Sequence, residues 1–455
     1  MKDILIVGGG YAGLYTAWQL ERRLKRGEAR VTVLDPRPYM TYQPFLPEVV
    51  SGAIEPRHAV VSLRRHLRRT SVVAGAATSI DHADRRVAVI ANDGRAYDLE
   101  YDVLVVTAGA VIRTFPIPGL AEEAIGMKNI EEAIAIRDRL LTAFDRAATL
   151  PAGPERARLL TVTFVGGGFS GVEGFAETMS LAAELLPYYP ELQPEDLSFH
   201  LVEARDRILP EVTDGPGRWV VEHLRSRGAR IHLNAQLLSA TGGHVVLSSG
   251  AEFDSDLIVW TAGNAATPVV ARHTDLPVDA RGYVLTRPDL RVGSADEVVP
   301  DAWAAGDDAA IPDLAVGGGT LTVPNAQHAV RQAKRLAANI VATLRGQEPT
   351  PYLHHNLGVV ATLGRGHGLF QFRRLVITGW TAWAMHRGYH LLAVPSWERK
   401  LRVLLGWVAA FLGRRDVASL AAVSAPRQAF VASAAADSRP PLRAVPTEPS
   451  DRDAA

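Results

Sequence analysis

The sequence predicts an α/β protein with two tandem dinucleotide-binding folds of the Rossmann type. The stretches "ILIVGGGYAG" from Ile4 and "TVTFVGGGFSGVE" from Thr161 carry the same glycine spacing. Each follows an apolar run rich in β-branched residues, which is typical of a strand buried on both faces of a parallel sheet. Each then enters a segment with helical spacing of apolar residues, so that both copies have the order of a βαβ unit.

The composition is that of a well-cored protein of two or three domains. The chain has 455 residues, of which 47% are hydrophobic and 22% charged, and this length exceeds one ordinary domain. Its formal net charge is zero, so no overall field favours nucleic acid as a partner. Cysteine is absent, which excludes disulfides, thiolate metal sites, iron–sulfur clusters and redox dithiols. We expect no metal site.

Four regions follow from the order of these patterns. We expect residues 1–115 and 280–350 to form a discontinuous first nucleotide-binding domain, and residues 116–279 to form the second, with a linker near residues 148–159. Residues 351–420 form a C-terminal region rich in aromatic and basic side chains. Residues 421–455 are rich in Ala, Pro and Ser without apolar periodicity, so we expect a disordered tail. The first strand starts by Ile4, which leaves no room for a signal peptide, and a cytoplasmic location is expected.

The first glycine loop contains Gly8, Gly10 and Gly13. In a G-x-G-x-x-G loop the first glycine permits the tight turn, the second lets a pyrophosphate approach, and the third allows close packing of helix and strand. Asp35 ends the next strand, where a carboxylate can bind ribose hydroxyls. The alternative is a glycine-rich turn without a ligand. The predicted contacts of the loop also include Tyr11 and Ala12.

The second loop repeats the pattern with Gly166, Gly168 and Gly171, and Glu203 closes the following strand. A carboxylate at this position accepts from a 2′-hydroxyl and repels a 2′-phosphate, which favours NADH over NADPH. Arg205 and Arg207 lie close by in the sequence and weaken this preference, so the sequence predicts NADH as the donor but not how strictly NADPH is excluded.

The order of motifs resembles the two-dinucleotide-fold flavoprotein reductases, and within them the type II NADH dehydrogenases. The resemblance covers residues 1 to about 430 and rests on "IVGGGYAGL", "YQPFLPEVVSG", "TAGA", "FVGGGFSGVE", "AAGD", "NAQHAV" and "GVVATLG". It implies that the first domain binds FAD without a covalent bond and that the second binds NADH. Electrons would then pass from NADH through FAD to a membrane quinone, without proton pumping.

The same resemblance assigns further cofactor contacts. Asp307 of "AAGD" would bind the ribityl or phosphate part of FAD, with a turn-capping aspartate as the alternative. Gln43 and Pro44 would lie beside the isoalloxazine ring. The remaining positions that match are Thr107, Ala108, Gly109, Ala262, Gly263, Ala326 and Gln327.

Three residues are implied in catalysis by the resemblance. Glu173 would handle a proton at the quinone, and its alternative is favourable pairing with the helix dipole; Glu177, one turn on, shares its face. Gln327 and Arg331 are four residues apart on a predicted helix and therefore share a face, which in the family lines the quinone pocket. The family has a second glutamine where this chain has Arg331, and Gln332 is displaced by one position.

The C-terminal region predicts helices that lie in the interface of an anionic membrane. Aromatic side chains flanked by arginines suit this position, and the uncharged stretch from Val403 to Gly413 is too short to span a bilayer. The region contains Trp380, Trp383, Trp397 and Trp407. His386 and His390 have helical spacing but no further ligand candidates in the sequence, and we interpret them as structural or interfacial. The membrane would be met from its cytoplasmic side; the alternative is domain packing or a homodimer.

Two other functions stay open. A soluble reductase of ferredoxin or rubredoxin would share both glycine loops but would have no use for the Trp- and Arg-rich C-terminal region. A flavin-binding redox sensor with negligible turnover is less compatible with the complete second fold. A disulfide reductase and a sulfide:quinone reductase both need cysteine, so the composition excludes them.

Overall fold

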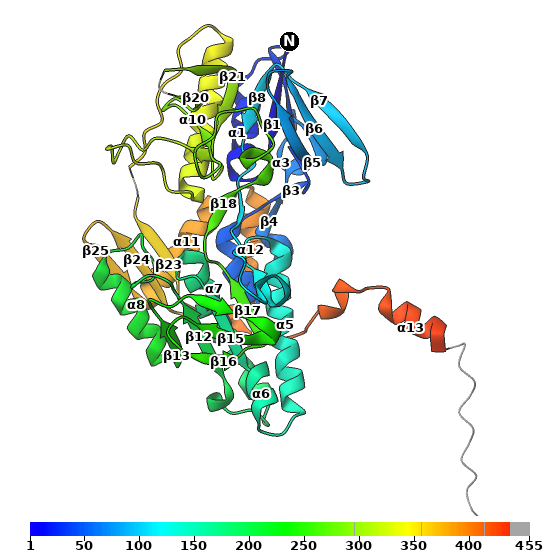
Figure 1. Ribbon diagram of the computed structural model, residues 1–455, viewed down its shortest axis with the longest axis vertical. Coiled ribbons are helices and arrows are strands. Elements are labelled where there is room, and N and C mark those ends of the chain that lie inside the picture. Colours follow the sequence, from blue (N-terminus) through cyan, green and yellow to red (C-terminus); the bar gives the residue numbers. More distant parts are fainter. Residues whose placement is uncertain (295, 356, 414, 437–455) are drawn as a thin grey trace, which may run out of the picture.

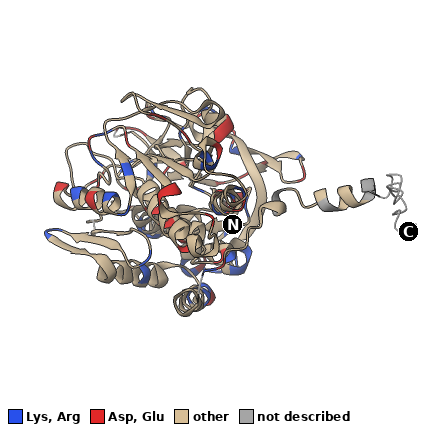
Figure 2. Cartoon of the chain, turned by 90° about the horizontal axis from the view of Figure 1, so that it is seen from below, with Lys and Arg blue, Asp and Glu red and all other residues tan. Residues whose placement is uncertain are grey.

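The computed structural model describes residues 1–294, 296–355, 357–413 and 415–436. Two α/β bodies, each built on a central sheet, lie one above the other along the long axis, with the C-terminal helices α11 and α12 beside their junction (Figure 1). The predicted α/β class with two nucleotide-binding folds is confirmed. Acidic and basic residues are interspersed in the view from below (Figure 2).

The upper body contains an eight-stranded sheet in the order β20-β21-β8-β1-β2-β5-β6-β7. Its strands are β1 (Lys2–Val7), β2 (Ala29–Asp35), β5 (Ser71–Asp81), β6 (Arg86–Ala91), β7 (Ala96–Glu100), β8 (Val103–Val106), β20 (Arg291–Gly293) and β21 (Val298–Ala304). Strand β1 pairs in parallel with β2 and β8, and β21 joins β8 in parallel. The chain therefore returns to its first sheet after the second body is complete. The helices α1 (Tyr11–Arg23) and α10 (Ala326–Leu344) pack on each other beside this sheet.

Short elements complete the upper body and lead toward the junction. They are β3 (Tyr39–Thr41), α2 (Leu46–Val50), β4 (Val60–Ser62) and α3 (Leu63–His66). Helix α2 packs against two helices of the lower body, so it links the two bodies directly.

The lower body contains a five-stranded parallel sheet in the order β10-β17-β11-β12-β13. Its strands are β10 (Ala124–Gly126), β11 (Thr161–Val165), β12 (Ser198–Val202), β13 (Ala229–His232) and β17 (Leu257–Trp260). Its helices are α5 (Ile130–Ala148), α6 (Pro154–Leu159), α7 (Phe169–Leu185) and α8 (Asp214–Ser226). The antiparallel strands β14 (Leu237–Ser239), β15 (His244–Leu247) and β16 (Glu252–Asp254) form a second, smaller sheet.

Residues 148–159, expected to be a linker, are largely helical. Helix α5 continues to Ala148, and α6 begins at Pro154. Proline suits the first position of a helix because its missing N–H would have no partner there. The chain crosses between the bodies instead at β9 (Ala110–Ile112) and β18 (Asn264–Ala266), which pair antiparallel.

The C-terminal region contains a sheet that the sequence reading missed. Strands β23 (Val359–Thr362), β24 (Gly368–Phe372) and β25 (Leu375–Thr378) form an antiparallel sheet, and helix α11 (Gly379–Ala393) packs on it. Close packing explains one glycine, because a Cβ at Gly368 would lie 2.5 Å from the backbone nitrogen of Trp383. Helix α12 (Trp397–Leu412) follows. Among the described residues, no helix has the length and apolar character needed to cross a membrane.

The expected disordered tail is only partly described. Residues Gln428–Ala436 form helix α13, which projects from the body (Figures 1 and 2). This segment is "QAFVASAAA", and alanine has the highest helix propensity, which favours a helix here. Residues 437–455 lie outside the described residues.

Candidate functional site

A cavity of about 1730 Å³ lies where the two bodies and the C-terminal sheet meet. Pockets for one drug-sized ligand measure roughly 300–1,000 Å³, so this cavity has room for more than one. The predicted site residues that line it are Tyr11, Gln43, Pro44, Gly166, Gly168, Gly171, Glu173, Glu203, Ala262, Gly263, Asp307, Ala326, Gln327 and Arg331. The predicted residues outside its lining are Gly8, Gly10, Ala12, Gly13, Asp35, Thr107, Ala108 and Gly109, and most of these build the first glycine loop and the turn beside it.

The first glycine loop has the geometry of a phosphate cradle. Gly8 has φ +102°, and a Cβ there would lie 2.2 Å from the carbonyl oxygen of Thr107. A Cβ at Gly13 would lie 1.8 Å from the Gly8 carbonyl oxygen, whereas one at Gly10 would meet no protein atom within 4 Å. The first and third glycines are therefore required by the protein's own packing, and the middle one borders open space at the N-terminus of α1, where anions bind well.

The second loop repeats this arrangement. Gly166 has φ +118°, a Cβ at Gly171 would lie 1.9 Å from the Gly166 carbonyl oxygen, and one at Gly168 would meet nothing within 4 Å. Glu203 Oε2 accepts the backbone N–H of Gly167 at 2.6 Å, and its Oε1 accepts that of Arg205 at 2.9 Å.

The carboxylate of the first fold makes the matching pair of contacts. Asp35 Oδ2 accepts the N–H of Gly9 at 2.7 Å, and Oδ1 accepts that of Arg37 at 2.7 Å. Burial raises the pKa of Asp35, and the two backbone N–H groups oppose that shift. Both acids are thus held at the end of the second strand of their fold, beside the glycine loop.

Arg205 and Arg207, which weaken the predicted preference for NADH, differ in their side-chain contacts. The Arg207 guanidinium donates to the Val212 carbonyl oxygen and pairs with Asp214, so contacts within its own domain hold it. Arg205 is exposed and makes no such side-chain contact with the described residues, although both arginines line the cavity near Glu203.

Polar groups with unused bonding capacity face the cavity near Gln43. The Tyr11 hydroxyl is buried and has no hydrogen-bond partner among the described residues, and burial raises the pKa of Tyr11 well above its usual value. Lys128, which the sequence reading missed, lines the cavity and donates from Nζ to Asn264 Oδ1 at 3.1 Å. Burial lowers the pKa of Lys128 and raises that of Asp307, and the two charges partly compensate. An orphaned hydroxyl, an ammonium and a carboxyl fit the polar edges of a flavin and its ribityl chain.

The "AAGD" loop is held from α10. The N–H of Gly306 donates to Gln332 Oε1 at 3.0 Å, and Gln332 Nε2 donates to Thr322 Oγ1 at 3.2 Å. The displaced glutamine therefore supports the loop and does not line the cavity. Asp308, next to Asp307, is fully buried, and burial raises its pKa to about 7 although the backbone N–H groups of Ala108 and Gly109 oppose that shift.

Glu173 is buried at the cavity wall and fixed by the C-terminal region. Its Oε1 accepts the N–H of Thr362 at 2.9 Å and lies 3.3 Å from His386 Nε2. These contacts come from β23 and α11, so the side chain is not there merely to pair with its own helix end. Glu177 is fully buried and is not in the cavity lining; its Oε1 accepts the hydroxyl of Thr362 at 2.9 Å.

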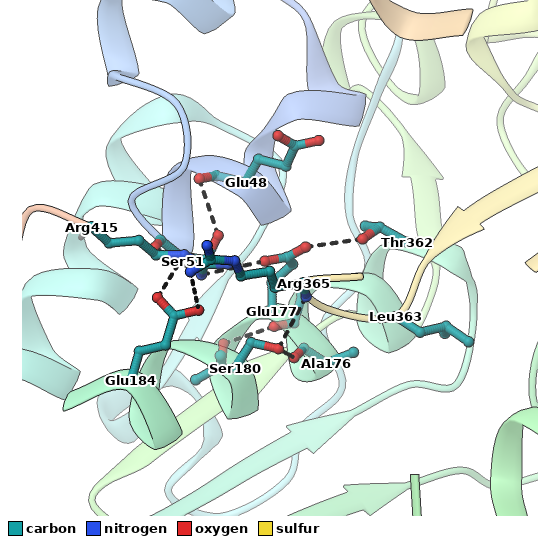
Figure 3. Close-up of polar contacts among 12 residues, drawn as sticks. Glu48, Ser51, Ala176, Glu177, Ser180, Glu184, Thr362, Leu363, Arg365 and Arg415 are labelled. Atoms are coloured by element: carbon teal, nitrogen blue, oxygen red, sulfur yellow. Dashed lines mark hydrogen bonds and ion pairs between the residues drawn. The ribbon is translucent and has the colours of Figure 1, made fainter. Parts of the chain in front are cut away.

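Arg415 closes a buried ionic cluster behind this wall (Figure 3). Its guanidinium lies 3.6 Å from Glu177 Oε2 and 3.1 Å from Glu184 Oε2, and it donates to the Ser51 carbonyl oxygen at 3.1 Å. The segment after α12 is thereby tied to α7 and to the end of α2.

Glu48 of α2 is a second buried acid that sequence reasoning missed. Its carboxylate lies 3.3 Å from the Arg387 guanidinium and 4.0 Å from His386 Nδ1, and it accepts the indole N–H of Trp407. Burial raises the pKa of Glu48, and Arg387 opposes that shift. The sequence feature that could have identified Glu48 is a single charged residue inside an apolar run, "FLPEVV".

Gln327 and Arg331 of α10 also line the cavity. Arg331 donates to the Gln327 carbonyl oxygen at 2.9 Å. His390 lines the same cavity, and its Nδ1 lies 3.1 Å from the Tyr42 hydroxyl. Burial lowers the pKa of His390 well below its usual value, so the ring is neutral. One cavity thus joins the second glycine loop, Glu173 and the Gln327 face.

Known proteins resemble this chain in both sequence and fold. Residues 2–333 match the family described as pyridine nucleotide-disulphide oxidoreductase. The chain belongs to this family. It is 29% identical over 427 residues to the type II NADH:quinone oxidoreductase Ndh of Mycobacterium tuberculosis, with 90% of this chain and 88% of the relative covered. It is 28% identical to the type II NADH:quinone oxidoreductase of Haemophilus influenzae, with 80% and 85% covered.

A solved member has nearly the same architecture. NDH2 of Plasmodium falciparum in complex with NADH superimposes with a TM-score of 0.83 at 18% identity, covering 92% of this chain and 99% of that one. The resemblance to type II NADH dehydrogenases is confirmed. Although the family name refers to disulphide, this chain has no cysteine and cannot perform that chemistry with its own side chains.

Proposed function

We propose that this chain is a type II NADH:quinone oxidoreductase, in which NADH reduces bound FAD and the flavin reduces a membrane quinone without proton pumping. The observation that carries this proposal is the single cavity between the second glycine loop and the Gln327–Arg331 face. The relatives named as NADH:quinone oxidoreductases cover the same length of chain. The flavin, when bound, supplies the hydride acceptance and the electron donation, while the protein positions it and its two substrates.

The positions of the residues indicate which of them would bind FAD and which would exchange a proton. The first glycine loop with Asp35 would hold the FAD pyrophosphate and ribose, and Gln43, Pro44, Lys128 and Asp307 would surround the ring and the ribityl chain. Glu173, which is buried beside His386, would exchange the proton that quinone reduction requires. The hydrogen bond from the backbone N–H of Thr362 fixes its carboxylate, so that it is preorganised for this exchange.

The preferred donor is NADH. Glu203 is held by two backbone N–H groups in the position that accepts a ribose 2′-hydroxyl and repels a 2′-phosphate. Glu203→Gln should narrow the preference for NADH over NADPH while NADH oxidation continues. Equal specificity constants for both donors in the wild type would contradict this assignment.

The membrane contact is proposed for α11 and α12, on the cytoplasmic side. One face of α12 exposes a continuous row of apolar side chains: Trp397, Leu401, Leu404, Leu405, Val408, Phe411 and Leu412. Val403 and Trp407 on the other face are buried. An apolar row beside basic residues suits a helix lying in an anionic interface. A homodimer through the same face is the alternative.

A spectroscopic titration tests the function. The purified protein should show a flavin absorption band that NADH bleaches without oxygen and that a soluble quinone then restores, with turnover when both are supplied. Restoration by a ferredoxin or rubredoxin but not by quinone would favour the soluble reductase. Bleaching without turnover would favour a redox sensor.

A further inference from the structure

The side-chain amide of Gln327 is held in one orientation. Its Oε1 lies 3.4 Å from the backbone nitrogen of Leu357, which can only donate, and 2.9 Å from His354 Nε2. The atom between them must therefore be the oxygen, and His354 must donate to it. Burial, together with the charge of Arg331, lowers the pKa of His354 to about 4, so the ring is neutral and carries its single proton on Nε2.

The amide nitrogen of Gln327 and the guanidinium of Arg331 can only donate. The amide NH₂ of Gln327 has no hydrogen-bond partner among the described residues, while Gln327 and Arg331 both line the cavity. Arg331 uses one N–H on the Gln327 carbonyl oxygen, and it forms no ion pair within the described part of the chain. Asp313 acts electrostatically on the histidines, but its carboxylate accepts the backbone N–H groups of Ala315 and Val316.

We propose that Gln327 and Arg331 form a donor-only, cationic subsite that selects quinones bearing an anionic oxygen next to a ring carbonyl, with His354 as the residue that positions Gln327. The inference rests on the proposed function. A glutamine at position 331 could donate or accept, whereas a guanidinium only donates and carries a full charge. The carbonyl and the neighbouring enolate oxygen of a hydroxyquinone supply two acceptors for the amide and the guanidinium, and hydrogen bonds to such charged groups are the strong ones.

Two probes of similar shape test the subsite: 2-hydroxy-1,4-naphthoquinone, which is an anion at neutral pH, and neutral 2-methyl-1,4-naphthoquinone. Because their potentials differ, the comparison is made between enzyme variants. Arg331→Gln should lower kcat/KM for the hydroxyquinone at least about tenfold more than it lowers kcat/KM for the neutral quinone, mainly through KM. An equal loss for both quinones would overturn the anionic subsite.

The role of His354 is tested by a matched pair of substitutions. His354→Phe should impair both quinones, because the amide of Gln327 is then free to rotate, and His354→Gln should restore reduction because its amide can donate in the same direction. Unchanged quinone kinetics in His354→Phe would overturn the positioning role. A wild-type protein whose NADH-reduced flavin reduces a soluble dye but neither quinone would overturn the proposed function itself.

Discussion

Thr107 and Thr261 hold the two glycine loops through the same pair of hydrogen bonds. The Thr107 hydroxyl donates toward the carbonyl oxygens of Val7 at 3.1 Å and Gly8 at 3.0 Å. The Thr261 hydroxyl faces those of Val165 at 3.0 Å and Gly166 at 3.2 Å. The two folds therefore repeat each other even in this side chain, a threonine that binds the carbonyl groups at the start of each glycine loop. Equivalent substitutions in the two loops should consequently affect FAD binding in one case and NADH binding in the other.

Gly10→Val and Gly168→Val form the first test. Neither position would bring a Cβ against the protein, and both have negative φ, so both variants should fold. The valine of Gly10→Val should occupy the pyrophosphate site and yield protein without flavin. Gly168→Val should retain flavin but raise KM for NADH at least about tenfold, because each ~1.4 kcal/mol lost is a factor of ten. Flavin content and NADH kinetics measure the two effects, and flavin-free Gly168→Val would contradict the assignment of the loops.

Removal of the buried guanidinium at Arg415 should destabilise the protein. Arg415→Met leaves Glu177 fully buried without its cation, and breaking a buried ion pair in this way costs about 3–5 kcal/mol. The matched control is Arg402→Met, because Arg402 pairs with Glu398 at an exposed position and exposed pairs contribute about 0–1 kcal/mol. The midpoint of chemical unfolding compares them. Equal midpoints would show that the cluster in Figure 3 contributes little to stability.

Asp308 should make stability depend on pH. Its pKa is raised from 3.8 to about 7 by burial, so the folded state retains a proton that the unfolded chain has released. Its contribution is fully present below pH 3.8 and is lost as the pH rises through about 7. Asp308→Asn should abolish this loss, which amounts to at most about 4 kcal/mol at 1.36 kcal/mol per unit.

Thermal unfolding of the FAD-loaded protein at several pH values measures this effect. The advantage of Asp308→Asn over the wild type should grow between pH 5 and pH 8, whereas the exposed control Asp84→Asn should show no such trend. A constant difference across the range would mean that Asp308 does not titrate there.

Membrane binding should depend on the exposed face of α12. A truncation after Leu369 would cut through β24 and remove the partners of Glu173 and Glu48, so it could not separate binding from folding. The triple substitution of Leu401, Leu405 and Leu412 to serine touches exposed side chains only. It should lower vesicle partitioning by at least about tenfold, since each buried leucine contributes roughly 1.5–3 kcal/mol.

The control for the membrane test is Ile90→Ser, which replaces an exposed apolar side chain on β6, away from α12. High salt should release the intact protein only in part, because salt screens the arginines and leaves apolar burial in place. Vesicle binding of the triple variant at the wild-type level, together with loss of a dimer, would favour the homodimer.

The local patterns of the sequence determined both nucleotide folds. Gly8 and Gly166 need positive φ, Gly13 and Gly171 leave no space for a Cβ, and an apolar strand precedes each loop. These constraints act between residues that are near in sequence, so they are visible in the spacing alone. The placement of Glu173, Gln327 and Arg331 also followed from motifs, although their roles are still predictions.

Only the tertiary structure decided what surrounds those residues. The partners of Glu173 are Thr362 and His386, and the amide of Gln327 is turned by His354. These contacts join segments far apart in the chain, and no periodicity encodes them. The histidines were read as structural because a lone histidine on a helix has no pattern that reveals a buried acid opposite. A buried charge needs a partner wherever the fold supplies one, and that partner is chosen by the packing of α2, α7, α10 and α11 around the cavity.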